Sequence, residues 1–261
     1  MVPFESIMKL ARNAGDAIME IYQRDFETYT KDDASPLTEA DLASHKTIVA
    51  GLKELTPELP VLSEEAADIS WQERSKWDEY WLIDPLDGTK EFIKKNGEFT
   101  VNIALIKDGE PVWGVVYAPV LNWLYHGGTL TGKAEKITAE GRSDIHVAKA
   151  PKPGETWKIV GSRSHQSDEF KAFVADMPGC DIVSMGSSLK LCLVAEGEAH
   201  LYPRLGLTSE WDTGAADAVL RGAGGQCLQH ESLQPLTYNQ KENILNPFFI
   251  CCAEPDSAWA K

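Results

Sequence analysis

Residues 80–89 of this chain read Tyr80-Trp81-Leu82-Ile83-Asp84-Pro85-Leu86-Asp87-Gly88-Thr89. The first four residues are apolar and predict a buried strand. Pro85 cannot extend the interior of a sheet and Gly88 permits a tight turn, so the chain must bend directly after this strand. At such a bend the carboxylates of Asp84 and Asp87 can converge, because neither is held to the alternating faces of a strand. Converging carboxylates repel one another, which in a folded protein usually means that a cation lies between them.

This acidic bend has a metal-binding and a structural interpretation. Carboxylate oxygens are hard ligands that suit Mg²⁺ or Ca²⁺ far better than Zn²⁺. The structural alternative is a polar turn in which Asp84 caps a helix that begins near Thr89. For an isolated motif of this kind, the structural alternative has more weight.

Two further acidic motifs favour the metal site. They are Leu62-Ser63-Glu64-Glu65, which follows a short apolar segment, and Trp211-Asp212-Thr213-Gly214-Ala215-Ala216, which opens a small-residue helix. Asp212 by itself is more often a helix cap than a metal ligand. Three acidic motifs at strand ends or helix starts in one acidic chain jointly indicate a shared metal site.

Apolar periodicity predicts the elements around these motifs. In the first half, helices are predicted over residues 7–22 and about 39–55, on either side of a polar stretch at 30–36. Strands are predicted at residues 61–62, 80–83, 99–106, 112–118 and 123–126, with a turn at 107–110.

The second half alternates between strands and helices. Strands are predicted near residues 158–161, 182–184, 199–202 and 226–229, and helices near 168–175, 188–195 and 212–220. This alternation indicates a layered α/β architecture. Residues 127–156 show no clear periodicity, so we place the boundary between the two halves there, giving 1–140 and 141–261.

The composition excludes several classes of function. Of the 261 residues, 43% are hydrophobic, which is enough for a sizeable core. The 25 basic and 40 acidic residues give a net charge of −15, so binding of nucleic acid and a polybasic membrane anchor are not expected. The five cysteines are odd in number and lack CxxC spacing, and no apolar stretch approaches the ~20 residues of a membrane span. We therefore expect a cytoplasmic protein with reduced thiols.

The three acidic motifs together resemble the inositol monophosphatase superfamily of Mg²⁺-dependent, lithium-sensitive phosphatases. Four longer motifs resemble one branch of it, the CysQ-type 3′(2′),5′-bisphosphate nucleotidases. They are Asp87-Gly88-Thr89-Lys90-Glu91-Phe92-Ile93, Asn96-Gly97-Glu98-Phe99-Thr100-Val101-Asn102-Ile103-Ala104, Gly186-Ser187-Ser188-Leu189-Lys190, and Leu193-Val194-Ala195-Glu196-Gly197 leading to Tyr202-Pro203-Arg204. The resemblance implies an αβαβα sandwich of the inositol monophosphatase and fructose-1,6-bisphosphatase type, with the metals at the junction of the two halves.

The resemblance also implies a set of metal ligands. Glu64, Asp84 and the backbone carbonyl of Leu86 would hold one Mg²⁺, and Asp84, Asp87 and Asp212 would hold a second. A third, weaker ion would share Glu64. Two ions ~3.5–4 Å apart can activate an attacking water and stabilise the leaving oxygen of an in-line displacement. The N-terminal half would thus carry most of the ligands, and the C-terminal half would carry Asp212 and the nucleotide contacts.

By the same resemblance, Thr89 and Asp41 would orient and deprotonate the attacking water, with Glu64 also among the catalytic residues. From spacing alone, Thr38-Glu39-Ala40-Asp41 has the form of a capping box, in which Asp41 simply closes a helix start. The resemblance favours the partnership of Asp41 with Thr89 over this cap.

An acidic chain needs specific basic residues to receive the second phosphate of a bisphosphate substrate. In the family, the positions matching His165, Ser187, Lys190 and Arg204 lie around the nucleotide. The remaining expected substrate contacts are Glu64, Leu86, Asp87, Gly88, Thr89 and Asp212. Arg can fork onto phosphate oxygens, whereas Lys acts as a point charge. A surface histidine without a ligand and a solvated helix lysine remain the alternatives for His165 and Lys190.

We therefore expect a Mg²⁺-dependent phosphatase that converts adenosine 3′,5′-bisphosphate to AMP and phosphate. The resemblance adds 3′-phosphoadenylyl sulfate as a further substrate, a place in sulfur assimilation and nucleotide recycling, and peripheral association with the cytoplasmic face of the inner membrane. An inositol phosphate or fructose bisphosphate phosphatase is the rival within the superfamily. A catalytically idle phosphate-binding regulator and a glycosidase are the rivals from other classes, although the motifs cluster too many acids for two-carboxylate chemistry.

Overall fold

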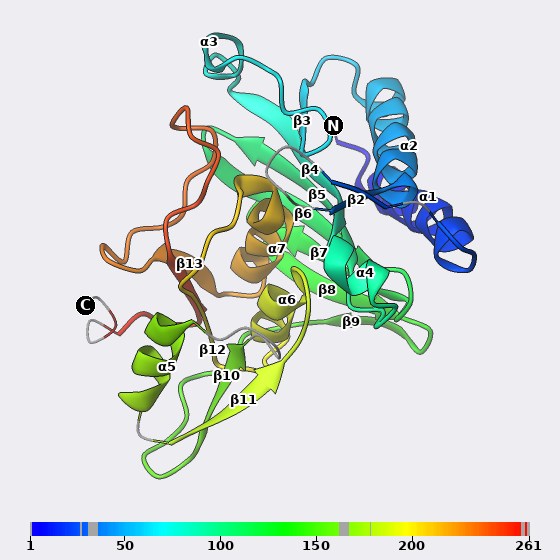
Figure 1. Ribbon diagram of the computed structural model, residues 1–261. Coiled ribbons are helices and arrows are strands. Elements are labelled where there is room, and N and C mark those ends of the chain that lie inside the picture. The colour runs from blue at the N-terminus through cyan, green and yellow to red at the C-terminus, as the bar shows by residue number, and fades with distance from the viewer. Residues whose placement is uncertain are drawn as a thin grey trace.

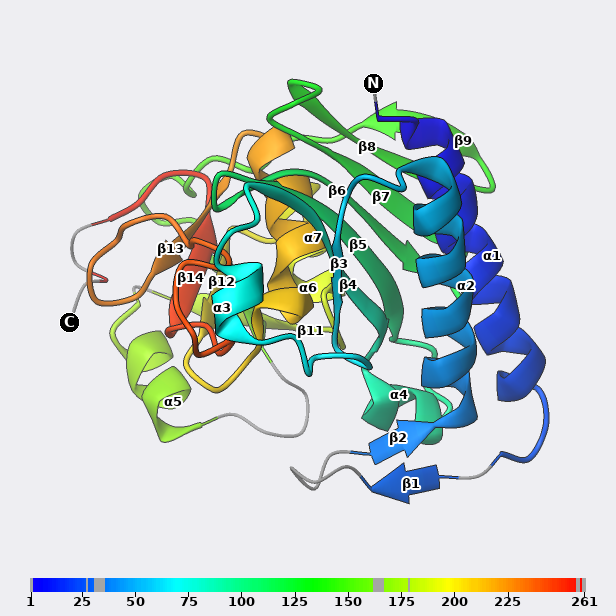
Figure 2. The same cartoon turned by 90° about the horizontal axis from the view of Figure 1, so that it is seen from above.

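Two large β-sheets alternate with three layers of helices through the molecule (Figure 1). The computed structural model describes residues 2–26, 28–30, 36–161, 167–177, 179–256 and 259. The layers follow in the order α1 and α2, a seven-stranded sheet, α6 and α7, a five-stranded sheet, and α5 (Figure 2). The αβαβα sandwich predicted from the sequence is confirmed.

The first layer is a pair of long helices that covers one face of the seven-stranded sheet. Helix α1 spans Phe4–Tyr22 and α2 spans Glu39–Leu55, so both predicted helices are confirmed. Their apolar stripes, for example Ile7 and Ile18 of α1, lie in one core with the sheet residues beneath them. Two short strands between the helices, β1 (Thr28–Thr30) and β2 (Pro36–Thr38), were not predicted.

The seven-stranded sheet has its strands in sequence order, and only β3 and β4 are parallel. Its strands are β3 (Val61–Ser63), β4 (Glu79–Asp87), β5 (Thr100–Lys107), β6 (Glu110–Ala118), β7 (Trp123–Gly128), β8 (Lys133–Thr138) and β9 (Gly141–Asp144). Short helices α3 (Trp71–Arg74) and α4 (Thr89–Ile93) flank β4. Strands β8 and β9 occupy the segment without periodicity. The expected boundary after residue 140 falls in the turn between these two strands. Strand β9 was therefore placed in the second half, but it pairs with β8 in the seven-stranded sheet.

Strand β4 sends alternate side chains into two cores. Trp81 and Ile83 pack under α1 and α2, whereas Tyr80 and Leu82 belong to the core that contains α7. Both faces of the strand are covered, which explains its continuous apolar run. By the same alternation Asp84 faces the α7 side of the sheet.

The bend after Asp84 takes the form of a β-bulge. Asp84 pairs with Asn102 and Asp87 with Thr100, so the bulge places Pro85 and Leu86 opposite a single residue of β5. The strand therefore continues past Pro85 to Asp87 instead of ending at residue 83. Gly88, at φ +94°, then takes the left-handed conformation that turns the chain into α4.

The second sheet and α5 form the far side of the molecule. The sheet has the order β11-β10-β12-β14-β13, with β10 (Trp157–Gly161), β11 (Cys180–Ser184), β12 (Leu201–Arg204), β13 (Gln226–Gln229) and β14 (Phe249–Cys252). Helix α5 spans Asp168–Ala175, α6 Leu189–Ala195 and α7 Glu210–Gly222. Among the described residues, no helix is long and apolar enough to cross a membrane.

Helix α7 lies between the two sheets and is buried along most of its length. It crosses β6 so closely that a Cβ atom at Gly114 would collide with the backbone of Ala215. This close contact holds α7 against the seven-stranded sheet, on the same face as the side chain of Asp84.

Candidate active site

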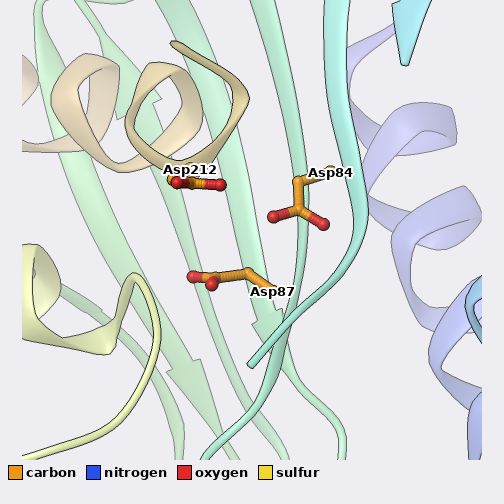
Figure 3. Close-up of side chains that lie close together, drawn as sticks. All are labelled: Asp84, Asp87 and Asp212. Atoms are coloured by element: carbon orange, nitrogen blue, oxygen red, sulfur yellow. The ribbon is translucent and has the colours of Figure 1, made fainter. Parts of the chain in front are cut away.

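Three aspartates from two elements converge where α7 meets the end of β4. Asp84 and Asp87 come from the end of β4, and Asp212 comes from the first turn of α7; Figure 3 shows their carboxylates turned toward one another. Each residue offers an oxygen, and these oxygens lie within 4.8 Å of one another. The bulge at the end of β4 and the packing of α7 together create this cluster.

Asp212 serves its helix and the cluster at the same time. It is not the N-cap: Ser209 holds that position, and Asp212, the third residue of the helix, closes the capping box. Its Oδ2 accepts a hydrogen bond from the backbone N–H of Ser209 at 2.8 Å. The cap therefore fixes the orientation of the carboxylate and does not compete with its role in the cluster.

Burial and mutual repulsion make the charged form of this cluster costly. Burial raises the pKa of Asp84 well above its usual range, and the charges of Glu64, Asp87 and Asp212 raise it further. Burial followed by the charge of Asp87 raises the pKa of Asp212 to about 8. A divalent cation would supply the missing compensation, and carboxylate oxygens at these separations suit Mg²⁺.

Asp87 lies beside the basic side chain of Lys190 and accepts a hydrogen bond from the turn before α6. Burial raises its pKa to about 6, but the charge of Lys190 and the backbone N–H of Ser188 oppose this shift. The Ser188 N–H donates to Asp87 Oδ2 at 2.5 Å. The turn before α6 therefore binds the cluster directly.

Glu64 and Leu86 lie beside the three aspartates. The backbone N–H of Glu64 donates to the Ile83 carbonyl at 3.2 Å, and its carboxyl group makes a hydrogen bond with that of Asp84. The Leu86 N–H donates to Asp84 Oδ1 at 3.1 Å from within the bulge. Glu64 and Leu86 thus neighbour Asp84, while the carboxylates that converge within 4.8 Å in the described part of the chain are those of the three aspartates.

Asp41 makes both of the contacts that the sequence presented as alternatives. Its Oδ2 accepts from the backbone N–H of Thr38 at 2.8 Å and from the Thr38 hydroxyl at 2.6 Å, as in a capping box. Its Oδ1 accepts from Thr89 Oγ1 at 3.2 Å. The contact with Thr89 that the resemblance favoured is present, and the capping box is present beside it, because the two oxygens of one buried carboxylate serve one contact each.

Two small adjoining cavities extend from the cluster toward the second sheet. The first, of about 90 Å³, is lined by Asp87, Asp212, Ser187, Lys190 and Arg204 among others. The second, of about 120 Å³, shares Lys190 and Arg204 and continues to Gly161 and Ser167. Both basic residues predicted to receive a phosphate therefore line the space next to the carboxylates.

The two basic residues are held differently. Burial lowers the pKa of Lys190, although the charge of Asp87 opposes this. Arg204 donates from Nη2 to the Leu207 carbonyl at 2.9 Å, while its Nε has no partner among the described residues. His165, with the rest of 162–166, lies outside the described residues.

Sequence reasoning assigned no role to Thr100, to Asn102 or to the hydroxyl group of Ser188, which the structure places here. Ser188 binds Asp87, and Thr100 and Asn102 of β5 bind Ser188. The sequence did contain a signal for Thr100 and Asn102, because they are polar residues in the largely apolar strand β5.

Comparison with known proteins agrees with this fold. Residues 3–249 match the sequence profile of the inositol monophosphatase family. The chain therefore belongs to the inositol monophosphatase family, and the resemblance is confirmed.

Relatives within this family are similar over most of their length. The 3′(2′),5′-bisphosphate nucleotidase CysQ of Salmonella typhimurium is 50% identical over 94% of this chain and 97% of its own. Its counterpart from Escherichia coli K12 is 49% identical over the same shares. The crystal structure of CysQ from Bacteroides thetaiotaomicron has a TM-score of 0.84 at 41% identity and covers 97% of both chains. An IMPase from Thermotoga maritima, at 23% identity and a TM-score of 0.75 over 97% of this chain and 92% of its own, shares the fold.

The metal-free protein is expected to lose stability as the pH rises from about 5 to about 8.5. The raised pKa values of Asp87 (about 6) and Asp212 (about 8) exceed the ~3.9 of an unfolded aspartate. The folded state therefore holds more protons in this interval, and the free energy of unfolding falls with pH, by about 2 kcal/mol or more. Urea denaturation in EDTA measures this slope, and Asp212→Asn should make it shallower. Parallel profiles for the two proteins would contradict the assignment.

Proposed function

We propose that this chain is a Mg²⁺-dependent 3′(2′),5′-bisphosphate nucleotidase that hydrolyses adenosine 3′,5′-bisphosphate to AMP and phosphate. The observation that carries the proposal is the juxtaposition of an acidic cluster with a cavity lined by Lys190 and Arg204. The cluster suits the reacting phosphate with its cations, and the two basic side chains suit a second phosphate. The CysQ relatives, at 49–50% identity, carry this activity in their names.

The cofactor part of the proposal is two Mg²⁺ ions, with a third, weaker ion sharing Glu64. The ligands would be Glu64, Asp84, the Leu86 carbonyl, Asp87 and Asp212. Bound there, Mg²⁺ supplies Lewis-acid polarisation of the reacting phosphate and lowers the pKa of water.

The chain's own residues orient the water and receive its proton. The Thr89 hydroxyl donates to Asp41 Oδ1, so its oxygen can accept a hydrogen bond from a water on the opposite side. A proton can then pass from that water through Thr89 to Asp41, whose other oxygen stays bound to Thr38. Ser188 holds Asp87 in place, while Lys190 and Arg204 bind the phosphate that does not react.

The direct test is phosphate release from a panel of substrates at equal concentration. The panel contains adenosine 3′,5′-bisphosphate, 3′-phosphoadenylyl sulfate, inositol 1-phosphate and fructose 1,6-bisphosphate, each with Mg²⁺ and with EDTA. We expect the two nucleotides to be hydrolysed fastest and EDTA to stop the reaction. Preference for inositol 1-phosphate would instead favour the rival within the family. The proposal extends to a cytoplasmic role in sulfur assimilation, where this reaction would recycle the nucleotide.

Lys190→Ala and Arg204→Ala are expected to raise the KM for adenosine 3′,5′-bisphosphate roughly tenfold each, because a charged hydrogen bond contributes ~1.5–3 kcal/mol. The KM for 3′-AMP, which lacks the second phosphate, should change much less. Steady-state kinetics on both substrates measure the difference, with the exposed Lys171→Ala as control. Equal losses on both substrates would indicate a structural role.

Li⁺ is expected to inhibit the enzyme where the same concentration of Na⁺ does not. Li⁺ is close to Mg²⁺ in size but has half its charge, so it could occupy one position of the cluster without supporting product release. Asp87 and Asp212 hold the position most exposed to exchange, so Asp212→Glu should alter the inhibition. Inhibition curves for LiCl and NaCl measure this, and NaCl controls for ionic strength. Superimposable curves would refute the prediction.

A further inference from the structure

Asn102 is a buried polar residue on β5 that lies directly opposite Asp84. The two residues pair in the antiparallel register of β4 and β5, and opposite residues in such a pair point to the same face of the sheet. On β5, Ala104 and Ile106 belong to the core that contains α7. The side chain of Asn102, which is 1% exposed, therefore lies on the α7 side beside Asp84.

One end of the Asn102 amide holds the turn before α6. Ser188 Oγ donates to Asn102 Oδ1 at 2.8 Å and also lies 2.8 Å from Thr100 Oγ1. The backbone N–H of Ser188 in turn binds Asp87. This chain of bonds joins β5 to a turn in which Ser187 has the unusual φ of +46°. Such a conformation persists only where surrounding contacts hold it.

The other end of the amide has no partner. Asn102 Nδ2 is a buried donor without an acceptor among the described residues. An unpaired buried donor destabilises the fold, so such groups normally have an acceptor. Asp84 is the residue directly opposite Asn102 on β4. Opposite side chains of an antiparallel pair have Cβ atoms about 4.5–5.5 Å apart, which makes the Asp84 carboxylate the candidate acceptor for this donor.

We propose that Asn102 is a positioning residue for the metal-binding cluster. Its Oδ1 fixes the Ser188 turn and thereby Asp87, and its Nδ2 donates to the carboxylate of Asp84 in the metal-bound protein. The Asn102 amide thus orients two of the ligands through hydrogen bonds without being a ligand itself. Ligating carboxylates usually have hydrogen-bond partners of this kind. This inference rests on the proposed metal-dependent function.

The test compares Mg²⁺ binding and kinetics in two variants. Asn102→Leu removes both ends of the amide at similar volume, and Asn102→Thr offers a strand-compatible side chain that cannot span both partners. Isothermal titration calorimetry without substrate should show Mg²⁺ affinity roughly 10–100-fold weaker in Asn102→Leu, the range typical of lost support behind metal ligands. Asn102→Thr should be weakened less. At saturating Mg²⁺, kcat should fall while the KM for the nucleotide stays within about threefold, because the basic side chains of Lys190 and Arg204 are unchanged.

A matched control separates positioning from stability. Thr56→Val removes another buried hydrogen bond of the same sheet, from Trp81 Nε1 at 2.9 Å, but on the α2 side. It should lower the urea midpoint as Asn102→Leu does and leave Mg²⁺ affinity unchanged. If both Asn102 variants bind Mg²⁺ like the wild type, the proposal is overturned. If the wild type itself neither binds Mg²⁺ nor releases phosphate, the proposed function is wrong, and measurements on the wild type alone show this.

Discussion

Replacing Asp84 with Asn is expected to reduce phosphate release by roughly a thousandfold or more, which corresponds to ~4 kcal/mol of lost transition-state stabilisation. Asp84 is the most deeply placed of the three converging aspartates and is 1% exposed. It is also the carboxylate that both proposed Mg²⁺ sites share. An amide in its place keeps the shape but removes the charge that would attract the cations.

The same substitution is expected to raise the stability of the metal-free protein. Burial and the charges of Glu64, Asp87 and Asp212 all disfavour the ionised form of Asp84, as its raised pKa shows. Removing one charge from a buried, mutually repelling group should increase the free energy of unfolding in EDTA by ~1–3 kcal/mol. Loss of activity combined with a gain in stability is a signature that a misfolded variant cannot produce.

Phosphate release and urea denaturation with and without Mg²⁺ measure the two effects. Asp108→Asn is the matched control, because Asp108 is an exposed turn residue at φ +51°, a conformation that Asn also tolerates. It should change neither quantity. Near wild-type turnover of Asp84→Asn at moderate Mg²⁺ would show that the two-metal assignment is wrong.

Asp41→Asn is expected to lower kcat by about 10²–10³-fold, within the range of a lost general base. Asn can still accept from Thr38 through its oxygen, but it then presents an amide N–H to Thr89 in place of an acceptor. The capping box therefore survives in part, and stability should fall by only about 1 kcal/mol. Thr89→Val should lose activity to a similar extent, while Thr89→Ser, which retains the hydroxyl, should keep most of it.

A double-mutant cycle identifies the partnership. If Asp41 and Thr89 form one relay, the double variant Asp41→Asn/Thr89→Val should be scarcely slower than either single variant, because the relay is already broken. Thr38→Val controls for the helix cap, since it removes the hydroxyl contacts of the box and leaves the Thr89 contact in place. Additive losses in the double variant would contradict a shared proton path.

Local patterns in the sequence determined much of the fold. The helical spacing of apolar residues predicted α1 and α2, and the apolar run before Asp84 predicted the centre of β4. The capping box at Thr38–Asp41 is equally local, because its partners are three residues apart. The long motifs identified the family and so the layered architecture.

Elements without a local signal became visible only in the structure. All four residues of β9 are exposed, so no alternation of apolar and polar residues marks the strand. Its existence depends on pairing with β8, which is a contact between segments and not a property of either segment.

The site itself was decided by tertiary packing. Motifs indicated that Asp84 and Asp212 belong together, but only the passage of α7 between the two sheets brings their oxygens within 4.8 Å. The double use of Asp41 depends on where α4 places Thr89 relative to α2. The position of Asn102 across from Asp84 depends on the register of β4 and β5, and the bulge that follows this pair shifts Asp87 by one residue. Periodicity reports which face of an element is buried, whereas the register and layering that bring two faces together arise from contacts between residues distant in the chain.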